Sequence, residues 1–256
     1  VDREHADVVE ALDPAAGDHR QAGAAGEVDR GIDVAAGEQA VARTALQAWA
    51  DDLAPRLGKD SDLPGTLTTI NRYLFDELGF AGNDQQYDDP RNSYLNEVFD
   101  RKLGIPISLA VVQIELMRRV GLPLDGVSFP GHFLVRLPVD DGILVMDPYN
   151  KGRPVSAEEL RERASPHLGG RAPDDVQLIE ILAPASHRTI LARMLRNLNG
   201  LYLEQGDWER VARTSDRLLK ITPEAAVRNR RTPQSTNPGE VRKRLAEARN
   251  RLQIPL

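Results

Sequence analysis

The middle of the chain, residues 104–147, constrains the fold more than any other part of the sequence. Apolar residues recur there at intervals of three and four over residues 107–120, which predicts one amphipathic helix that begins after a Gly-Ile-Pro turn. Two runs of β-forming residues follow, at 132–137 and 142–147, and the turn-forming residues 138–141 separate them. A helix followed by an antiparallel hairpin predicts a fold of the α+β class.

The loop of this hairpin also predicts its register. If residues 138–141 form a four-residue connection, Leu137 pairs with Gly142. At the far end of the two strands, His132 then lies opposite Asp147. Directly opposed residues share a face of the sheet and have Cβ atoms about 5 Å apart. The sequence therefore predicts a contact between the imidazole of His132 and the carboxylate of Asp147.

Composition divides the whole chain into three parts. Residues 1–40 are rich in Ala, Gly, Asp and Glu and hold no aromatic residue, which predicts an acidic N-terminal arm with little surface to bury. Residues 41–185 contain the helix and the hairpin, preceded by helical stripes over 42–57 and 67–78. In residues 186–256, the spacing of apolar residues predicts two amphipathic helices, and an arginine-rich tail follows them.

The two C-terminal helices carry a pattern of their own. They are predicted over 190–204 and 208–221, and several of their residues fall at the spacings of one tetratricopeptide unit. Asn199 stands where that pattern prefers glycine. Because a single unit of this kind cannot bury its own apolar face, we expect the pair to pack on the preceding domain.

The absence of cysteine excludes several classes of protein. A chain without thiols cannot be a disulfide-stapled secreted scaffold, cannot hold zinc or iron–sulfur clusters through thiolates, and has no cysteine nucleophile. Its histidines show no metal-ligand spacing, and it contains no glycine-rich phosphate loop. Neither a metal nor another cofactor is therefore predicted.

Charge and hydropathy narrow the choice of partners. The chain carries 33 basic and 39 acidic residues, a net charge of −6, which provides no general attraction to nucleic acid. The arginine-rich tail lacks interleaved aromatic residues, so nucleic acid is not the expected partner there either. No apolar run approaches the ~20 residues that span a membrane, and no signal peptide is visible. These features predict a cytoplasmic protein that does not enter a membrane.

Four motifs, in this order along the chain, resemble those of the SirB-type bacterial family. They are Arg-Asn-Ser-Tyr-Leu-Asn at 91–96, Gly-Ile-Pro-Ile-Ser at 104–108, Gly-Val-Ser-Phe-Pro-Gly-His-Phe-Leu at 126–134 and Asp-Pro-Tyr-Asn at 147–150. The resemblance covers about residues 65–225. It implies a transglutaminase-like (papain-like) core of a helix plus an antiparallel sheet, with flanking helices and a C-terminal, tetratricopeptide-like helical hairpin.

The resemblance also implies roles for single residues. In active proteins with this core, a cysteine in a Gly-x-Cys turn at the start of the helix is the nucleophile, and it acts with a histidine and an aspartate. His132 matches the base and Asp147 the residue that orients it, whereas Pro106 occupies the position of the thiol. Asn92 or Ser93 could simply cap the short helix that follows them. The residues predicted to line the cleft are Asn92, Ser93, Asn96, Ser108 and Gly131.

Three interpretations of His132 are open. It could form a purely structural hydrogen bond with Asp147, or it could belong to a vestigial cleft that binds a peptide or a small molecule. It could also support residual catalysis with Ser93 or Ser108 in place of the thiol. Ser108 lies two residues after Pro106, so its hydroxyl should point about 200° away around the helix, which argues against a direct substitution.

The leading hypothesis is a catalytically inactive transglutaminase-like protein that binds a protein or peptide partner and could act in regulation. The alternative is a hydrolase or acyl-transfer enzyme in which His132 and Asp147 work with a non-cysteine nucleophile or an activated water. A nucleic-acid-binding role of the basic tail ranks last. The sequence leaves the oligomeric state open.

Overall fold

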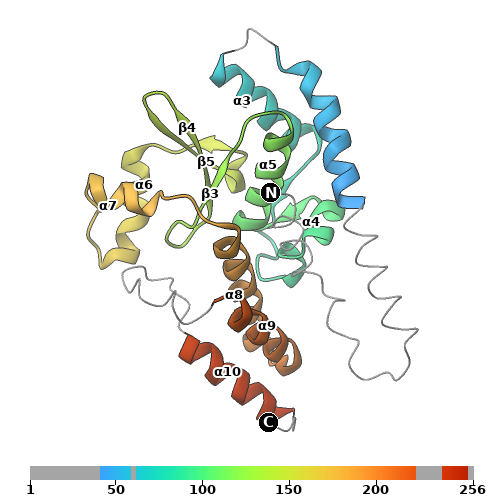
Figure 1. The fold of residues 1–256 in the computed structure, drawn as a ribbon, viewed down its shortest axis with the longest axis vertical. Coiled ribbons are helices and arrows are strands. Elements are labelled where there is room, and N and C mark those ends of the chain that lie inside the picture. Colours follow the sequence, from blue (N-terminus) through green and yellow to red (C-terminus); the bar gives the residue numbers. More distant parts are fainter. Residues whose placement is uncertain (1–40, 59–61, 223–237, 253–256) are drawn as a thin grey trace.

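The computed structural model describes residues 41–58, 62–222 and 238–252 (Figure 1). The predicted acidic arm, residues 1–40, lies outside the described residues. Residues 41–53 are helical and are followed by a 3-10 turn. The elements after this helix are η1 (Ala54–Arg56), α3 (Leu63–Asn71), η2 (Arg72–Glu77), β1 (Ala81–Gly82), η3 (Pro90–Asn92), α4 (Leu95–Arg101), β2 (Leu103–Gly104), α5 (Pro106–Arg119), β3 (Asp125–Val127), β4 (Leu134–Val139), β5 (Gly142–Asp147), η4 (Pro148–Asn150), β6 (Arg153–Pro154), α6 (Ala157–Ala164), η5 (Ser165–Leu168), α7 (Asp175–Ile181), α8 (His187–Gln205), α9 (Trp208–Ile221) and α10 (Pro238–Arg251).

Four antiparallel strands form the main sheet, in the order β3-β4-β5-β6, and β1 and β2 form a separate short parallel pair. The predicted helix over 107–120 corresponds to α5, which starts at Pro106 because proline is favoured in the first turn of a helix. The predicted stripe over 67–78 is α3 followed by the π-helical turn η2. The α+β class, with a helix plus an antiparallel sheet and flanking helices, is confirmed.

The register of the β4/β5 hairpin differs from the prediction. Gly142 pairs with Val139 rather than with Leu137, so the predicted register is wrong by two residues. The reason is Pro138, which the sequence suggests is in the loop but which extends β4 at an exposed position. β3 pairs only with residues 134–136 of β4, so Pro138 lies on an edge, where a residue without an N–H is tolerated. A shift by two keeps every side chain on its predicted face.

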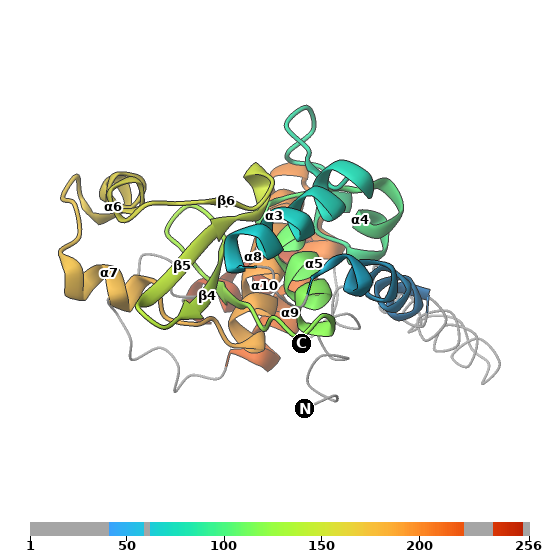
Figure 2. The same cartoon turned by 90° about the horizontal axis from the view of Figure 1, so that it is seen from above.

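Apolar clusters cover both faces of this sheet. Figure 2 shows α5 on one side of β4 and β5, and α6 and α7 on the other. Val135 and Met146 point into the main core, which includes buried residues of α3, α5 and α8. Leu134 and Val145 point into a second core, built mainly with α6 and α7. Neighbouring residues along each strand alternate between the two cores because successive side chains point to opposite faces.

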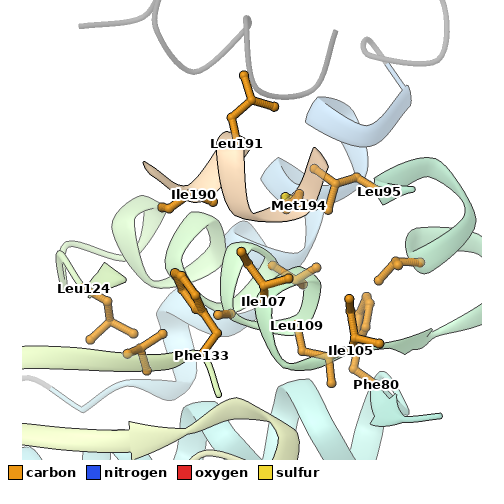
Figure 3. Close-up of a cluster of buried hydrophobic side chains, with 14 of the residues drawn as sticks. Phe80, Leu95, Ile105, Ile107, Leu109, Leu124, Phe133, Ile190, Leu191 and Met194 are labelled. Atoms are coloured by element: carbon orange, nitrogen blue, oxygen red, sulfur yellow. The ribbon is translucent and has the colours of Figure 1, made fainter. Parts of the chain in front are cut away.

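The C-terminal helices pack on the α+β core through α8. Ile190 and Met194 of α8 lie in the same buried cluster as Ile107 of α5 (Figure 3). The hydroxyl groups of Tyr94, at the start of α4, and Tyr202, on α8, are also hydrogen-bonded. The expected packing of the helical pair on the preceding part of the chain is therefore present.

A third helix, α10, packs against α9 in a region where the sequence predicts only a basic tail. The buried Asn199 of α8 joins all three helices: its Nδ2 donates to Ser215 Oγ of α9 at 2.9 Å, and its Oδ1 accepts from Arg244 of α10 at 3.0 Å. The tetratricopeptide-like assignment and the domain boundary between residues 185 and 186 remain predictions. Within the described residues, no helix has both the length and the apolar character needed to cross a membrane.

Candidate functional site

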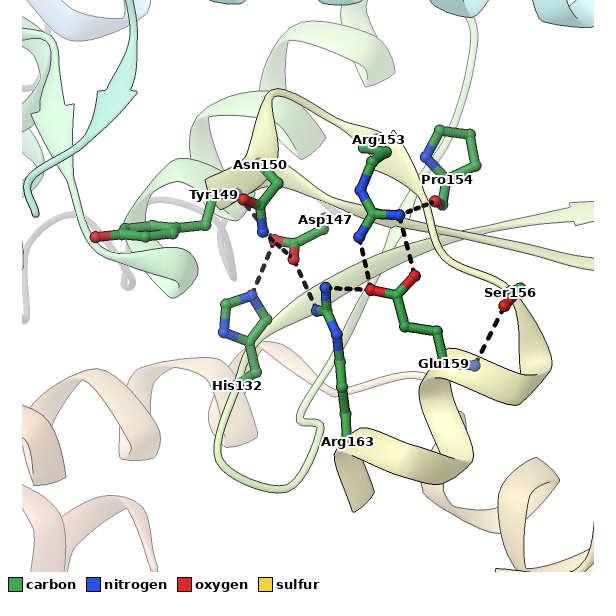
Figure 4. Close-up of polar contacts among 9 residues, drawn as sticks. All are labelled: His132, Asp147, Tyr149, Asn150, Arg153, Pro154, Ser156, Glu159 and Arg163. Carbon is green, nitrogen blue, oxygen red and sulfur yellow. Dashed lines mark hydrogen bonds and ion pairs between the residues drawn. The ribbon is translucent and has the colours of Figure 1, made fainter. Parts of the chain in front are cut away.

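Asp147 is the last residue of β5, and its side chain has no exposed surface. Its Oδ1 accepts a hydrogen bond from the N–H of Tyr149 at 3.1 Å, which caps the turn η4. Its Oδ2 accepts from Asn150 Nδ2 at 2.7 Å and from Arg163 Nη1 at 2.9 Å (Figure 4). Together with a contact to His132 on Oδ1, these bonds engage both oxygens, as a buried carboxylate requires.

His132 approaches this carboxylate from the turn that precedes β4. Its Nε2 lies 2.9 Å from Asp147 Oδ1, so the predicted contact is present even though the predicted register is wrong. The N–H of His132 donates to Phe129 O at 3.2 Å, which closes the turn. Because Nε2 faces Asp147, the favoured neutral tautomer carries its proton on Nε2, and Nδ1 is left to meet another group. The side chain is 21% exposed, so that group can come from outside the protein.

The charges around Asp147 keep it ionised. Burial alone would raise the pKa of this carboxyl, but the hydrogen bonds from His132, Arg163 and Asn150 outweigh burial and hold the pKa of Asp147 well below its usual range. The imidazole therefore faces a carboxylate at neutral pH. Such a carboxylate fixes an imidazole in one tautomer.

Two tyrosines extend the site on one side of His132. The ring of Tyr149 lies edge-on to the His132 ring, with centroids 6.2 Å apart, and the ring of Tyr87 lies edge-on to Tyr149 at 6.1 Å. Tyr149 Oη donates to Asp84 Oδ1 at 2.6 Å. Burial and this neighbouring carboxylate raise the pKa of Tyr149 well above its usual value, so the hydroxyl stays protonated. Tyr87 is 48% exposed, and the two rings therefore form an aromatic border that leads from His132 to the protein surface.

The start of α5 lies near this aromatic border. Gly82 of β1 pairs with Gly104 of β2, two residues before α5 begins. The ring of Tyr149 covers Gly82 so closely that a Cβ added there would lie 2.5 Å from the ring. Pro106 is the first residue of α5 and is buried. Its pyrrolidine ring carries no nucleophilic atom, so the position where the resemblance expects a thiol holds no reactive group.

The hydroxyl of Ser108 is hydrogen-bonded to backbone groups. Ser108 is fully buried, and its Oγ accepts a hydrogen bond from the N–H of Ile105 at 3.0 Å. The same Oγ lies 2.6 Å from Asn92 O, to which it donates. These two bonds cap the first turn of α5 and tie it to η3. The hydroxyl proton of Ser108 is therefore directed at a carbonyl oxygen rather than at His132.

The other polar residues predicted for the cleft have different surroundings. Asn92 is fully buried, and its Nδ2 donates to Gln86 O at 2.6 Å and to Tyr87 O at 3.1 Å, which holds the loop that carries Tyr87. Ser93 is buried, and its hydroxyl has no hydrogen-bond partner among the described residues. Asn96 is half-buried on the first turn of α4. In the described part of the chain, no hydrogen bond joins any of these three residues to His132.

Gly131 has a left-handed backbone, with φ of 68°, and the ring of His167 lies close beside it. A Cβ added to Gly131 would lie 2.3 Å from Nε2 of His167, so the ring of His167 closely approaches the backbone at this glycine. Sequence reasoning misses His167, Tyr149 and Arg163 as parts of this site. Two of the three carry a signal in the sequence: Tyr149 belongs to the Asp-Pro-Tyr-Asn motif, and Arg163 lies four residues after Glu159 and so is expected to pair with it on a helix.

Histidine and carboxylate side chains do not gather into a metal site in the ranges that the structure describes, where no group of three or more comes together. His132 contacts one oxygen of the Asp147 carboxylate, and Arg163 is hydrogen-bonded to the other. A metal ion would need a free oxygen of that carboxylate and further ligands beside it.

Comparisons with known proteins show what the chain is similar to. The family model described as the transglutaminase-like superfamily matches residues 40–196. A UPF0162 protein of Xylella fastidiosa is 62% identical over 180 residues, which cover 70% of this chain and 64% of that protein. A UPF0162 protein of Vibrio cholerae is 31% identical over 188 residues, 69% of this chain and 67% of its own length. F-box only protein 21 of Mus musculus is 31% identical over 149 residues, 55% of this chain and 22% of its own length.

The match to the Xylella protein is partial in both directions. The chain spans less than two thirds of that relative's length, so the relative contains sequence that this chain does not match. No solved structure matched the chain.

Proposed function

The chain belongs to the transglutaminase-like superfamily, and we propose that this protein is a binding module without thiol chemistry. In this proposal, the site around His132 recognises a peptide segment of a protein partner. One observation carries the proposal: Pro106 fills the first position of α5, where an active relative would hold its thiol, while His132 and Asp147 stay paired. The site thus keeps an oriented imidazole and has no nucleophile at the expected position.

His132 provides the recognition group in this proposal. With its proton on Nε2 and directed at Asp147, the ring offers Nδ1 as an acceptor for an N–H of the ligand. The rings of Tyr149 and Tyr87 add apolar contact surface beside that acceptor. A few polar groups next to an aromatic border are typical of sites that bind peptides or small molecules. A peptide backbone supplies the N–H groups that such an acceptor requires.

Binding to a library of immobilised peptides tests this function directly. Purified protein should select a subset of peptides, and His132→Ala should weaken binding to them by tenfold or more, the cost of about 1.4 kcal/mol for one lost hydrogen bond in a desolvated site. His187→Ala, on the first turn of α8, is the matched control and should leave binding unchanged. Equal binding by the wild type and His132→Ala, or no selection at all, would refute the proposal.

A Pro106→Cys variant tests the assignment of the nucleophile position. The chain has no other cysteine, so alkylation by iodoacetamide reports on this thiol alone. A helix N-terminus and a nearby imidazole lower a thiol pKa from about 8.5 to between about 3.5 and 7.5. If the pKa of the introduced thiol is about 6.5, its thiolate at pH 6.5 is roughly fiftyfold more abundant than that of an ordinary thiol. Because a thiolate of lower pKa is a weaker nucleophile, the net rate of alkylation should be roughly sixfold higher than for an ordinary thiol.

Two controls complete the test of this assignment. Adding His132→Ala to Pro106→Cys should remove most of the rate advantage. An ordinary alkylation rate in Pro106→Cys would show that Pro106 does not stand where the thiol belongs. Turnover of model esters or amides by the wild-type protein, lost in His132→Ala, would replace the binding proposal with a hydrolase that uses another nucleophile or an activated water.

A further inference from the structure

Arg163, on α6, contacts the oxygen of Asp147 that His132 does not (Figure 4). Its Nη1 donates to Asp147 Oδ2 at 2.9 Å, and His132 Nε2 lies 2.9 Å from Oδ1. We propose that Arg163 is a positioning residue, which holds the plane of the Asp147 carboxylate so that Asp147 in turn orients His132. This inference rests on the proposed function, because the orientation of the imidazole matters only if its Nδ1 meets a ligand.

The side chain of Arg163 is itself held in place. Its Nη2 donates to Glu159 Oε1 at 2.6 Å, one turn earlier on α6. Glu159 also accepts two hydrogen bonds from Arg153, at 2.6 and 3.0 Å. Arg153 lies on β6, where it is the direct partner of Asp147 in the sheet. The contacts therefore form a closed ring that begins and ends at Asp147, and such a ring restricts where the guanidinium can lie.

The same stretch of chain also contacts the turn that carries His132. His167 lies four residues after Arg163, and its ring lies so close to Gly131, the residue before His132, that a Cβ added there would require the ring to move. Gly131 holds its left-handed backbone beneath that ring. The segment from α6 to η5 therefore supports both halves of the pair, the carboxylate through Arg163 and the turn of the imidazole through His167.

The remaining donors to Asp147 cannot fix the plane of its carboxylate as Arg163 does. The N–H of Tyr149 and the amide of Asn150 belong to the turn that Asp147 begins, so they move with it. Among the described residues, Arg163 is the donor that ties Oδ2 to a different element. Rotation of the carboxylate is therefore opposed at one oxygen by His132 and at the other by Arg163.

The tautomer of His132 provides a test that does not depend on a ligand. Long-range ¹H–¹⁵N correlation spectra of protein labelled with ¹⁵N-histidine measure the ratio of the Nε2–H to the Nδ1–H form, at a pH where titration shows each variant's imidazole to be neutral. In Arg163→Met, we expect this ratio to fall by about threefold to tenfold, the effect of weakening one oriented hydrogen bond. Arg163→Lys, which can still donate to Oδ2, should recover at least half of the change.

The matched control is Arg161→Met, on the same helix. Arg161 pairs with Asp175, which is 86% exposed, and it does not contact Asp147. This variant should leave the tautomer ratio unchanged. A folded Arg163→Met variant with an unchanged or higher ratio would overturn the proposal. If Arg163 only offset the charge of Asp147, its removal would make the carboxylate a stronger acceptor for His132 and would not lower the ratio.

A second variant decides the question if Arg163→Met does not fold. Glu159→Gln keeps Arg163 but weakens the bond that orients it, so the ratio should fall by about twofold, and an unchanged ratio would overturn the proposal. The outcome is separate from that of the proposed function. Failure of the peptide experiment with a normal tautomer response would refute the binding function alone, and the reverse result would refute the positioning role alone.

Discussion

The substitution Asp147→Asn measures what the buried carboxylate contributes to stability. An asparagine keeps the shape of the side chain but replaces one acceptor oxygen by an NH₂ donor, so the donors at one end lose their acceptor. If the Oδ2 end is lost, Arg163 and Asn150 each lose a hydrogen bond to a charged acceptor, and such bonds are worth about 1.5–3 kcal/mol each. Arg163 keeps its bond to Glu159 and is 27% exposed, which limits any further cost of an unpaired cation.

We therefore expect Asp147→Asn to lower the free energy of unfolding by about 3 kcal/mol. Urea unfolding at pH 7, followed by circular dichroism, measures this change, and the tautomer ratio of His132 should fall with it. Asp76→Asn is the control, because Asp76 and its partner Lys151 are 55% and 67% exposed and such a pair contributes at most about 1 kcal/mol. A loss in Asp147→Asn no larger than that in Asp76→Asn would refute the reasoning that the carboxylate is held by its charge.

Three further predictions follow from the same contacts. Gly131→Ala should lower the free energy of unfolding by about 1–3 kcal/mol in urea titrations, because it puts a Cβ on a residue with a left-handed φ and against the ring of His167. Adding His167→Ala should relieve the clash with the ring and leave the cost of the backbone conformation. Because the pKa of Asp147 lies below its unfolded-state value of about 3.9, its contribution to the free energy of unfolding should be complete above about pH 5 and be lost as pH falls through the folded-state pKa. In Asp147→Asn, the free energy of unfolding should not show this loss at acid pH. Asn199→Ala should speed amide hydrogen exchange across α10, measured by mass spectrometry, because Arg244 loses its acceptor; unchanged exchange there would mean that packing alone holds α10.

Local sequence patterns predict the elements that build the site. The three-to-four spacing of apolar residues predicts α5, because α5 packs one face on the core, and β-forming runs predict β4 and β5. The contact between His132 and Asp147 is predicted from a register that is wrong by two residues. The prediction survives because the error is even and keeps Asp147 on its face, and because His132 reaches it from a turn outside the ladder.

The parts that sequence reasoning misses depend on contacts between distant segments. Nothing near His167 indicates that its ring covers Gly131, and Arg163 has a recognisable local partner in Glu159 but none that points to Asp147. Polar residue type also misleads. Ser108 is predicted to line the cleft, but a serine at this position of a helix is equally suited to bond the backbone, and its hydroxyl does so.

The link between α8 and the His132 turn limits how the partner surface can be mapped. Arg193 of α8 donates to Ser128 Oγ at 3.0 Å and to Phe129 O at 2.9 Å, and Phe129 O is the same atom that accepts the N–H of His132. α8 also places Met194 in the main core. Removing the C-terminal helices would therefore disturb the His132 turn as well as any surface that the helices provide, and loss of binding after such a truncation would not distinguish the two. Single substitutions at exposed positions of α9 and α10, with the tautomer of His132 as the check that the site is intact, separate a partner surface on the helices from one at the His132 site.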